Sequence, residues 1–143
     1  MAGLTLAQAR TIIASAFEEA SRLQLKPLGV AVLDDGGHTM AFERQDGASA
    51  MRFKIAHGKA YGAIAMGLGS RTLFERAQAQ PYFISAMNAL ADGALVPVPG
   101  GVLVRDGDGA LLGAVGVTGD NSDNDEKCAI AGIEAAGLVA DTG

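Results

Sequence analysis

Two cations stand within a run of small residues in the middle of the chain, where a helix is expected over residues 49–68. At helical spacing, Arg52 and Lys59 fall on the same side as Ala56 and Ala63, within about 40° of one line. An unpaired charge on a packed face is costly, so each cation must reach solvent, pair with an acid or bind an anion. The pattern therefore leaves two interpretations open. One is a structural ion pair; the other is a cationic floor for a carboxylate, with Lys59 as a proton-transfer group.

The two histidines and the single cysteine are the other residues with reactive side chains. His38 closes an expected hairpin turn, where a surface position is the simpler interpretation. His57 has no second histidine or cysteine three or four positions away, so the sequence gives no support for a zinc site. Either histidine could still be an axial haem ligand, which requires only one imidazole. Cys128 stands among small residues near the start of the last expected helix, which indicates a buried, unreactive thiol.

An acidic loop follows a glycine-punctuated apolar run in the segment GAVGVTGDNSDNDE, residues 113–126. An EF-hand beginning at Asp120 fails, because Asp125 stands where the loop needs glycine and Ala131 where it needs glutamate. The start of a helix explains the loop better, with Ser122 as the N-cap and acids in the first turn, near the positive end of the dipole. Those acids are Asp123, Asp125 and Glu126. We therefore expect neither a metal site nor a phosphate site in this loop.

Composition limits the class of protein. The chain has 143 residues, of which 49% are hydrophobic and 19% charged, so it is long and apolar enough for one globular domain with a real core. A net charge of −5 argues against nucleic-acid and membrane partners. No stretch is apolar enough to span a bilayer, and the N-terminus does not have the pattern of a signal peptide. The single cysteine excludes an intramolecular disulfide, and we expect a cytoplasmic location.

The periodicity predicts one α+β domain over residues 1–143, with the element order α-β-β-α-α-β-β-β-α. Hairpin-length connections within each group of strands favour an antiparallel sheet with helices packed on it. Glycines inside the last strand, Gly113 and Gly116, indicate a bulge or the close approach of another element. The expected helices are 6–24, 49–68, 70–81, 82–92 and 123–139, and the expected strands lie in 28–34, 38–44, ALVPVP, GGVLVRD and ALLGAVGVTG.

Several longer segments carry a resemblance to a known family. They are VAVLDDGGHTMAFERQDGAS, IAHGKAYGA, VPVPGGVLVRD and GDGALLGAVGVTGDNSDNDEKCAIAGIEAAGL. In this order, over nearly the whole chain, they resemble the GlcG/HbpS-like haem-binding family. The same module is similar to the C-terminal domain of some corrinoid adenosyltransferases. The resemblance implies a profilin-like fold, with a five-stranded antiparallel sheet flanked by helices, and a homo-oligomer, often large and even-numbered.

The resemblance also implies a set of site residues. Some members of the family bind haem, and the domain is labelled haem-binding or haem-degrading. Others belong to loci for small-molecule catabolism, such as glycolate use. The positions of this chain that match the family's recurrent motifs are Arg44, Asp46, Lys59, Pro99, Gly100, Gly101, Gly119, Asp120, Asp125 and Glu126.

Three hypotheses about function remain. In the first, the protein binds haem or another tetrapyrrole, with Arg44, Arg52 or Lys59 pairing the propionates and His57 or His38 as axial ligand. Haem is then the one expected cofactor.

In the second hypothesis, the protein is an enzyme of small-molecule catabolism. Lys59 and Arg44 would hold an anionic substrate, and Asp120, Asp125 or Glu126 would act as acid or base. In the third, the chain is a non-catalytic structural module whose glycine-rich strands serve oligomer packing. The sequence does not decide whether the protein is an enzyme.

Overall fold

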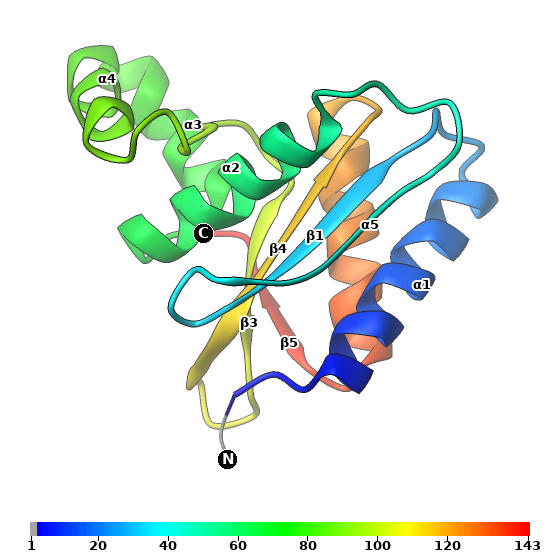
Figure 1. Ribbon diagram of the computed structural model, residues 1–143. Helices are drawn as coiled ribbons and strands as arrows, with labels where there is room; N and C mark the ends of the chain where they lie inside the picture. The colour runs from blue at the N-terminus through cyan, green and yellow to red at the C-terminus, as the bar shows by residue number, and fades with distance from the viewer. Residues whose placement is uncertain (1–2) are drawn as a thin grey trace.

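The computed structural model describes residues 3–143, which form a five-stranded antiparallel sheet with helices on both faces (Figure 1). The strand order across the sheet is β2-β1-β4-β3-β5, and every neighbouring pair is antiparallel. The α+β class and the flanked antiparallel sheet are therefore confirmed. In chain order the elements are α1 (Leu6–Arg22), β1 (Gly29–Asp34), β2 (Thr39–Arg44), α2 (Arg52–Met66), α3 (Ser70–Ala79), α4 (Pro81–Leu90), β3 (Gly101–Arg105), β4 (Leu111–Thr118), α5 (Ser122–Ala135) and β5 (Val139–Asp141).

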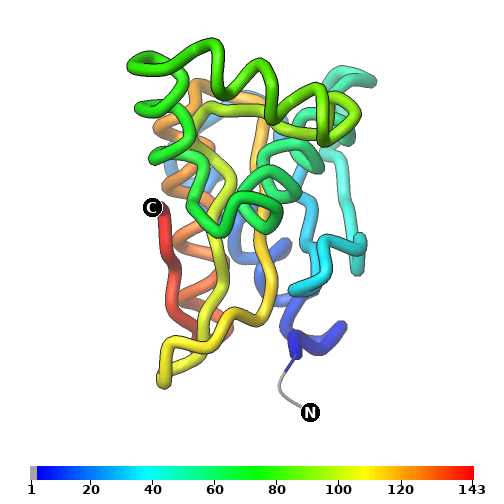
Figure 2. The backbone as a smooth tube through the Cα atoms, turned by 90° about the vertical axis from the view of Figure 1, so that its left-hand side faces the viewer, coloured from blue at the N-terminus to red at the C-terminus, as the bar shows by residue number. Residues whose placement is uncertain are grey.

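The helices divide into two layers and a projecting pair. Helices α1 and α5 pack against each other on one face of the sheet, and α2 covers β1, β4 and β3 on the other face. The main hydrophobic core lies between the sheet and the α1–α5 layer. Helices α3 and α4 gather at one end of the molecule, away from α1 (Figures 1 and 2).

The first helix forms as its sequence predicts. Thr5 is the N-cap, its hydroxyl accepts from the Gln8 backbone N–H, and the Gln8 side chain accepts from the Thr5 backbone in return. The buried side of α1 carries small and branched residues at helical spacing, so it lies flat on the sheet and on α5.

The fifth strand comes from a different segment than the sequence indicated. Residues 94–99, expected as a strand, have no strand pairing and instead cross α2, where the Val96 backbone N–H donates to the Gly58 carbonyl at 3.1 Å. Two prolines in this segment lack the N–H that a ladder requires. The place beside β3 is taken by β5, which follows α5, so the observed order is α-β-β-α-α-α-β-β-α-β.

The last long helix also begins one residue differently from expectation. Asn121, not Ser122, is the N-cap of α5, and its side-chain oxygen accepts from the Asn124 backbone N–H at 2.8 Å. Ser122 is the first residue inside the helix. Of the three acids expected in the first turn, Asp123 and Asp125 do lie there, whereas Glu126 lies beyond it.

Two glycines in β4 allow the backbones of helix α2 and of the neighbouring strand β1 to lie close to the backbone of β4. A Cβ on Gly116 would collide with the carbonyl oxygen of Ala56 in α2, and one on Gly113 with that of Leu33 in β1. The expectation that these glycines mark close approach is therefore confirmed. This contact sets the depth at which α2, with its charged residues, lies on the sheet.

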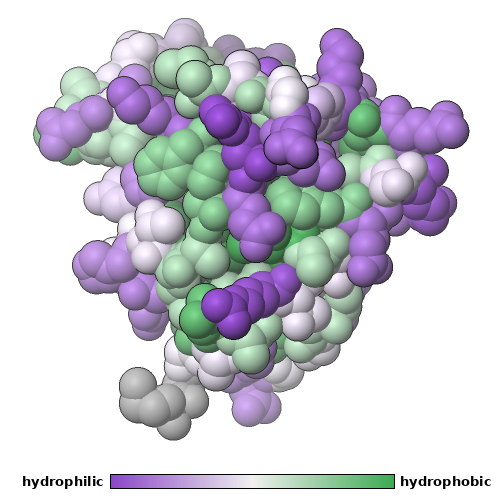
Figure 3. All heavy atoms as spheres, turned by 45° about the vertical axis from the view of Figure 1, so that its right-hand side comes forward, coloured by the Kyte–Doolittle hydropathy of each residue, from purple (hydrophilic) through white to green (hydrophobic). Residues whose placement is uncertain are grey.

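Some large apolar side chains remain at the surface. On the face shown in Figure 3, hydrophobic residues gather in the middle and hydrophilic side chains project around them. The exposed large apolar residues are Leu6, Met51, Phe53, Tyr82, Leu90 and Val139. Those on α2 and α4 lie outside the main core and are free to meet a ligand or another protein.

We predict that Gly116→Ala destabilises the fold by about 3 kcal/mol or more, because the new methyl group forces α2 away from β4. Urea unfolding followed by circular dichroism measures this change. Gly107→Ala is the matched control, since nothing lies within 4 Å of a Cβ at that position. Equal stability of the two variants would contradict the close packing of α2 on β4.

Candidate functional site

A buried ion pair joins the two faces of the sheet. The Lys59 ammonium from α2 lies 3.1 Å from Asp125 Oδ2 at the start of α5, and it donates to the Val117 carbonyl of β4 at 2.9 Å. Both side chains are only 2% exposed. The other oxygen of Asp125 accepts from the Asp120 backbone N–H at 2.9 Å. The pair therefore connects α2, the end of β4 and α5 at one point.

Burial opposes the charge on both partners of this pair. It lowers the pKa of Lys59 and raises the pKa of Asp125, and the charge of each partner counteracts that effect on the other. The nearby Arg52 charge lowers the pKa of Lys59 further. Of the two interpretations left open by the sequence, the structure shows the internal ion pair. A ligand that took Lys59 would leave a buried carboxylate without its partner.

The other acids of the loop are also engaged. Asp120 accepts from the Asn124 side chain and from the backbone N–H groups of Asn121 and Lys26, which together lower its pKa to about 2. Asp120 is therefore ionised at neutral pH and has no proton to give.

Arg71 is a partner that the sequence did not single out. Its Nε lies 3.0 Å from Glu126 Oε2 and its Nη2 lies 2.6 Å from Asp123, and these carboxylates raise the pKa of the guanidinium. Arg71 lies on α3, far from Glu126 in sequence. The folded chain brings the first turns of α3 and α5 within reach of the long Arg71 side chain, so no local pattern could have revealed the contact.

The glycine-rich turns form the walls around the ion pair. Gly100, at φ +120°, passes beside the Lys59 ammonium, and a Cβ on Gly101 would collide with the Lys59 carbonyl. The Gly101 backbone N–H donates to the buried Ser70 hydroxyl at 2.7 Å, and Pro99 is buried beside this turn. Gly119 similarly passes the backbone of residues 27–28. The three glycines shape the surroundings of Lys59, and Pro99 also lines a small cavity of about 180 Å³ beside the start of α5.

Two arginines meet at one corner of the sheet on the α2 side. Arg44 of β2, Gly29 of β1 and Thr118 of β4 are paired across the three strands. Arg52 crosses above Gly29, where its Cβ lies 3.1 Å from the position of a glycine Cβ, and its Nη1 donates to Thr118 Oγ1 at 2.8 Å. Arg44 is exposed and Arg52 half-buried. Beside them α2 begins without a side-chain cap and without an acid in its first turn, so the corner is cationic.

An aromatic strip runs along the outer side of α2 from this corner. It consists of Phe42, Phe53, His57 and Tyr61. The His57 ring centroid lies 5.9 Å from that of Phe53 and 5.6 Å from that of Tyr61, onto which it is stacked. Phe42 of β2 meets Phe53 edge-on at 4.9 Å. Burial lowers the pKa of His57, so its imidazole is neutral at pH 7.

His38 has a different environment. Its side chain is 82% exposed at the β1–β2 turn, and its Nδ1 lies 3.1 Å from Asp34 Oδ1. Within residues 3–143, no hydrogen bond to the His57 imidazole is found, whereas the His38 imidazole is held by this carboxylate. The structure thus separates the two candidate imidazoles into one flanked by aromatic rings and one in solvent.

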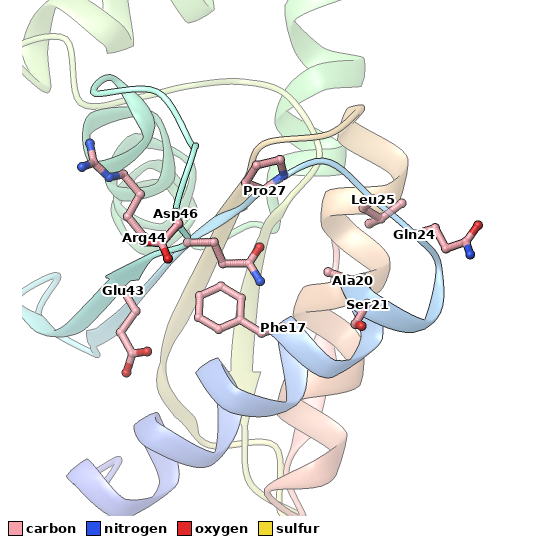
Figure 4. A pocket seen from close by; sticks show the side chains of 10 residues that line it. Phe17, Ala20, Ser21, Gln24, Leu25, Pro27, Glu43, Arg44 and Asp46 are labelled. Carbon is pink, nitrogen blue, oxygen red and sulfur yellow. The ribbon is translucent and has the colours of Figure 1, made fainter.

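A cavity of about 680 Å³ opens between the end of α1 and strand β2. Arg44 and Asp46 both line it, together with Phe17 and residues of the α1–β1 connection. Figure 4 shows the Phe17 ring between α1 and β2, whereas the Arg44 side chain extends away from Phe17. Neither Lys59 nor either histidine is among the described residues of its wall.

The described residues contain no group of three or more His, Cys, Asp or Glu side chains arranged to hold a metal ion. Within the same residues, no helix is long and apolar enough to cross a membrane. Cys128 is buried, and burial raises the pKa of its thiol to about 12. It is an unreactive thiol, as expected.

These features define a small profilin-like α+β domain. The acids of its charged loop form ion pairs within the domain, and an aromatic strip on α2 remains accessible. The chain belongs to the family described as haem degrading protein HbpS-like, whose model matches residues 4–134.

Solved structures agree with this assignment. The PduOC–haem complex is 26% identical with a TM-score of 0.85, covering 95% of this chain and 96% of that chain. HbpS is 29% identical with a TM-score of 0.79, and the match covers 94% of this chain and 90% of the HbpS chain. Klebsiella pneumoniae ORFY shares the fold, with a TM-score of 0.85 and 22% sequence identity. The match covers 96% of this chain and 92% of the ORFY chain. Among curated proteins there is no significant match.

We predict that Lys59→Met and Asp125→Leu each destabilise the protein by about 3–5 kcal/mol, because each leaves one buried charge without a partner. The double variant should lose much less than the sum, since no charge is then left unpaired. Urea unfolding of all four proteins gives the coupling energy. Glu19→Gln, which breaks the exposed Arg22 pair, is the control and should not change stability measurably. Additive losses would show that the pair does not act as a unit.

Proposed function

We propose that this protein binds haem or a closely related tetrapyrrole on the α2 side of the sheet, with His57 as the axial ligand. The observation that carries the proposal is the half-buried, neutral imidazole of His57 between two aromatic rings. Membership of the HbpS-like family and the likeness to the PduOC–haem complex support haem as the ligand. A neutral imidazole is the form that coordinates haem iron.

The aromatic strip suits a flat, apolar ring system. Phe53 and Tyr61 are one turn away from His57 on either side, so a macrocycle over His57 would lie against both rings. Phe53 is 41% exposed, and contact with a ligand would remove this apolar surface from water. His38, exposed and held by Asp34, lacks such surroundings and is the weaker candidate.

The cationic corner would hold the two haem carboxylates. Arg52 precedes His57 by five residues, about 7.5 Å along the helix axis and about 140° around it, so its guanidinium would meet a propionate at the start of the helix and not beside the imidazole. Arg44 lies beside Arg52 through the pairing of β2 with β1. Guanidinium groups bind carboxylates through paired hydrogen bonds. The proposal therefore assigns the propionates to Arg44 and Arg52, and leaves Lys59 to Asp125.

We also propose a homo-oligomer with an even number of subunits, working in the cytoplasm. The family resemblance suggests the assembly, and exposed apolar residues on α2 and α4 supply surface for it. A single buried thiol is compatible with a reducing compartment. The three acids expected to act in small-molecule catabolism, Asp120, Asp125 and Glu126, are all engaged in internal contacts, so the structure gives this alternative no support.

Haemin titration tests the axial ligand. We predict a saturable Soret change at micromolar haemin, with affinity at least about 10-fold lower in His57→Ala, because one iron ligand is lost. His38→Ala is the matched control and should bind as the unmodified protein does. Because the pKa of His57 is lowered from 6.5, affinity should hold at pH 7 and fall once the pH drops below that lowered pKa. Unchanged binding in His57→Ala would exclude this ligand.

A second titration tests the propionate partners. Arg44→Gln should weaken haemin binding about two- to fivefold at low salt, the range of an exposed ion pair, and less at high salt. Binding of haem dimethyl ester, which has no carboxylates, should not change with this substitution. Arg10→Gln, an exposed arginine on α1, is the control. If Arg44→Gln and Arg10→Gln behaved alike with haemin, the corner would not be the carboxylate site.

A further inference from the structure

Helix α4 is an uncharged helix that packs on little of its own protein. None of its ten residues, PYFISAMNAL, is charged. Its inner side is held by Ile84, which is buried, and by Phe83 and Met87, in a small cluster with residues of α3 and the following loop. Among the described elements, α4 packs on α3 and not on the sheet. The rest of its surface faces outward at one end of the molecule (Figure 2).

The outer side of α4 has a regular arrangement of large and small residues. Tyr82, Ala86 and Leu90 follow one another at four-residue spacing and therefore share one side of the helix. Tyr82 is 72% exposed and Leu90 is 78% exposed, while Ala86 and the neighbouring Ala89 are exposed small residues. The two large residues are thus equally distant from Ala86, with room between them for another helix to approach.

A hollow lies beside one end of this side. Its volume is about 200 Å³, and it is walled by Met87 and Leu90 of α4, by Tyr61 of α2 and by Leu95. That volume corresponds to roughly six or seven waters of liquid, enough for one large side chain. The walls are mainly apolar, so an aromatic ring suits the hollow better than water does.

The four-residue spacing of Tyr82, Ala86 and Leu90 and the hollow beside Leu90 together form a surface that a second copy of α4 can complement. In an antiparallel pair with a two-fold axis at Ala86, Tyr82 of each copy lies opposite Leu90 of the partner subunit. Tyr82 then reaches the hollow beside that leucine, and the same contact occurs twice. A two-fold interface needs a surface that complements itself in this way.

Charge favours the same arrangement. Each copy has a net charge of −5, so contacts between most parts of the two surfaces bring like charges together. The ten residues of α4 carry no charge. The guanidinium of Arg76 in α3 lies over the Phe83 ring, away from the side of Tyr82, Ala86 and Leu90 in sequence spacing. Two copies therefore meet along that side without carboxylates facing each other. A buried aromatic anchor in an apolar hollow is also the usual energetic centre of a protein interface.

We propose that two copies of this chain dock through α4, with Tyr82 of each inserted beside Leu90 of the other. This inference rests on the homo-oligomer proposed above and gives it a specific interface. It does not depend on haem, and the interface includes Tyr61, which also belongs to the aromatic strip. The ligand site and the subunit contact are therefore adjacent on α2.

The first experiment measures the mass of the haem-free full chain by sedimentation and light scattering over a concentration series. Ala86→Glu places two carboxylates at the proposed axis and should raise the dissociation constant of the pair by at least about 100-fold. Tyr82→Ala should weaken it as well, and Tyr82→Phe should retain it. Ala14→Glu, on the exposed side of α1, is the matched control and should leave the mass unchanged. Thermal unfolding checks that each variant is folded.

A second experiment detects the axis itself. Ala86→Cys should form a disulfide-linked dimer under mild oxidation, because the two introduced thiols face each other, while Ala14→Cys should not. Cys128 is buried and does not interfere. An unmodified protein that stays monomeric would overturn both the homo-oligomer and this interface. An oligomer that Ala86→Glu leaves intact and Ala86→Cys does not cross-link would overturn the interface alone.

Discussion

The buried pair of Lys59 and Asp125 joins the elements on which the rest of the structure depends. It ties α2 on one face of the sheet to α5 on the other through the end of β4. Glycine is required at positions 100 and 101 beside this pair, because a side chain there would collide with the Lys59 ammonium or with the backbone of α2. With this pair in place, the depth of α2, the path of residues 94–101 and the start of α5 are all fixed together.

That arrangement decides which residues remain available to a ligand. The charged loop at the start of α5 uses its acids internally, on Lys59, Arg71 and backbone N–H groups. What stays open is the outer side of α2, where a neutral histidine lies between aromatic rings, and the corner at the start of α2 where Arg52 crosses above Gly29. A flat, apolar, dicarboxylate ligand matches this set in both shape and charge, and the family assignment points to the same ligand class.

Exposed apolar surface continues from α2 to α4. Tyr61 belongs both to the aromatic strip and to the hollow beside Leu90, so a subunit docked through α4 would border the ligand site. The projecting α3–α4 pair therefore provides two sets of contacts that the sheet does not provide. In the proposed assembly α4, which has no charged residue, contacts the partner, while α3 contributes Arg71 to the charged loop.

By itself, the sequence determined the α+β class, the capping box that starts α1 and the close approach at Gly113 and Gly116, because these depend on local periodicity and spacing. The resemblance of long segments indicated the family. The sequence also limited Lys59 to three outcomes, which are reaching solvent, pairing with an acid or binding an anion, without deciding among them. Tertiary structure decided that Lys59 pairs with Asp125, that Arg71 reaches Glu126, and that the fifth strand is Val139–Asp141 instead of residues 94–99. Those outcomes depend on packing between segments far apart in the chain, where backbone donors and buried charges are satisfied only by the folded whole.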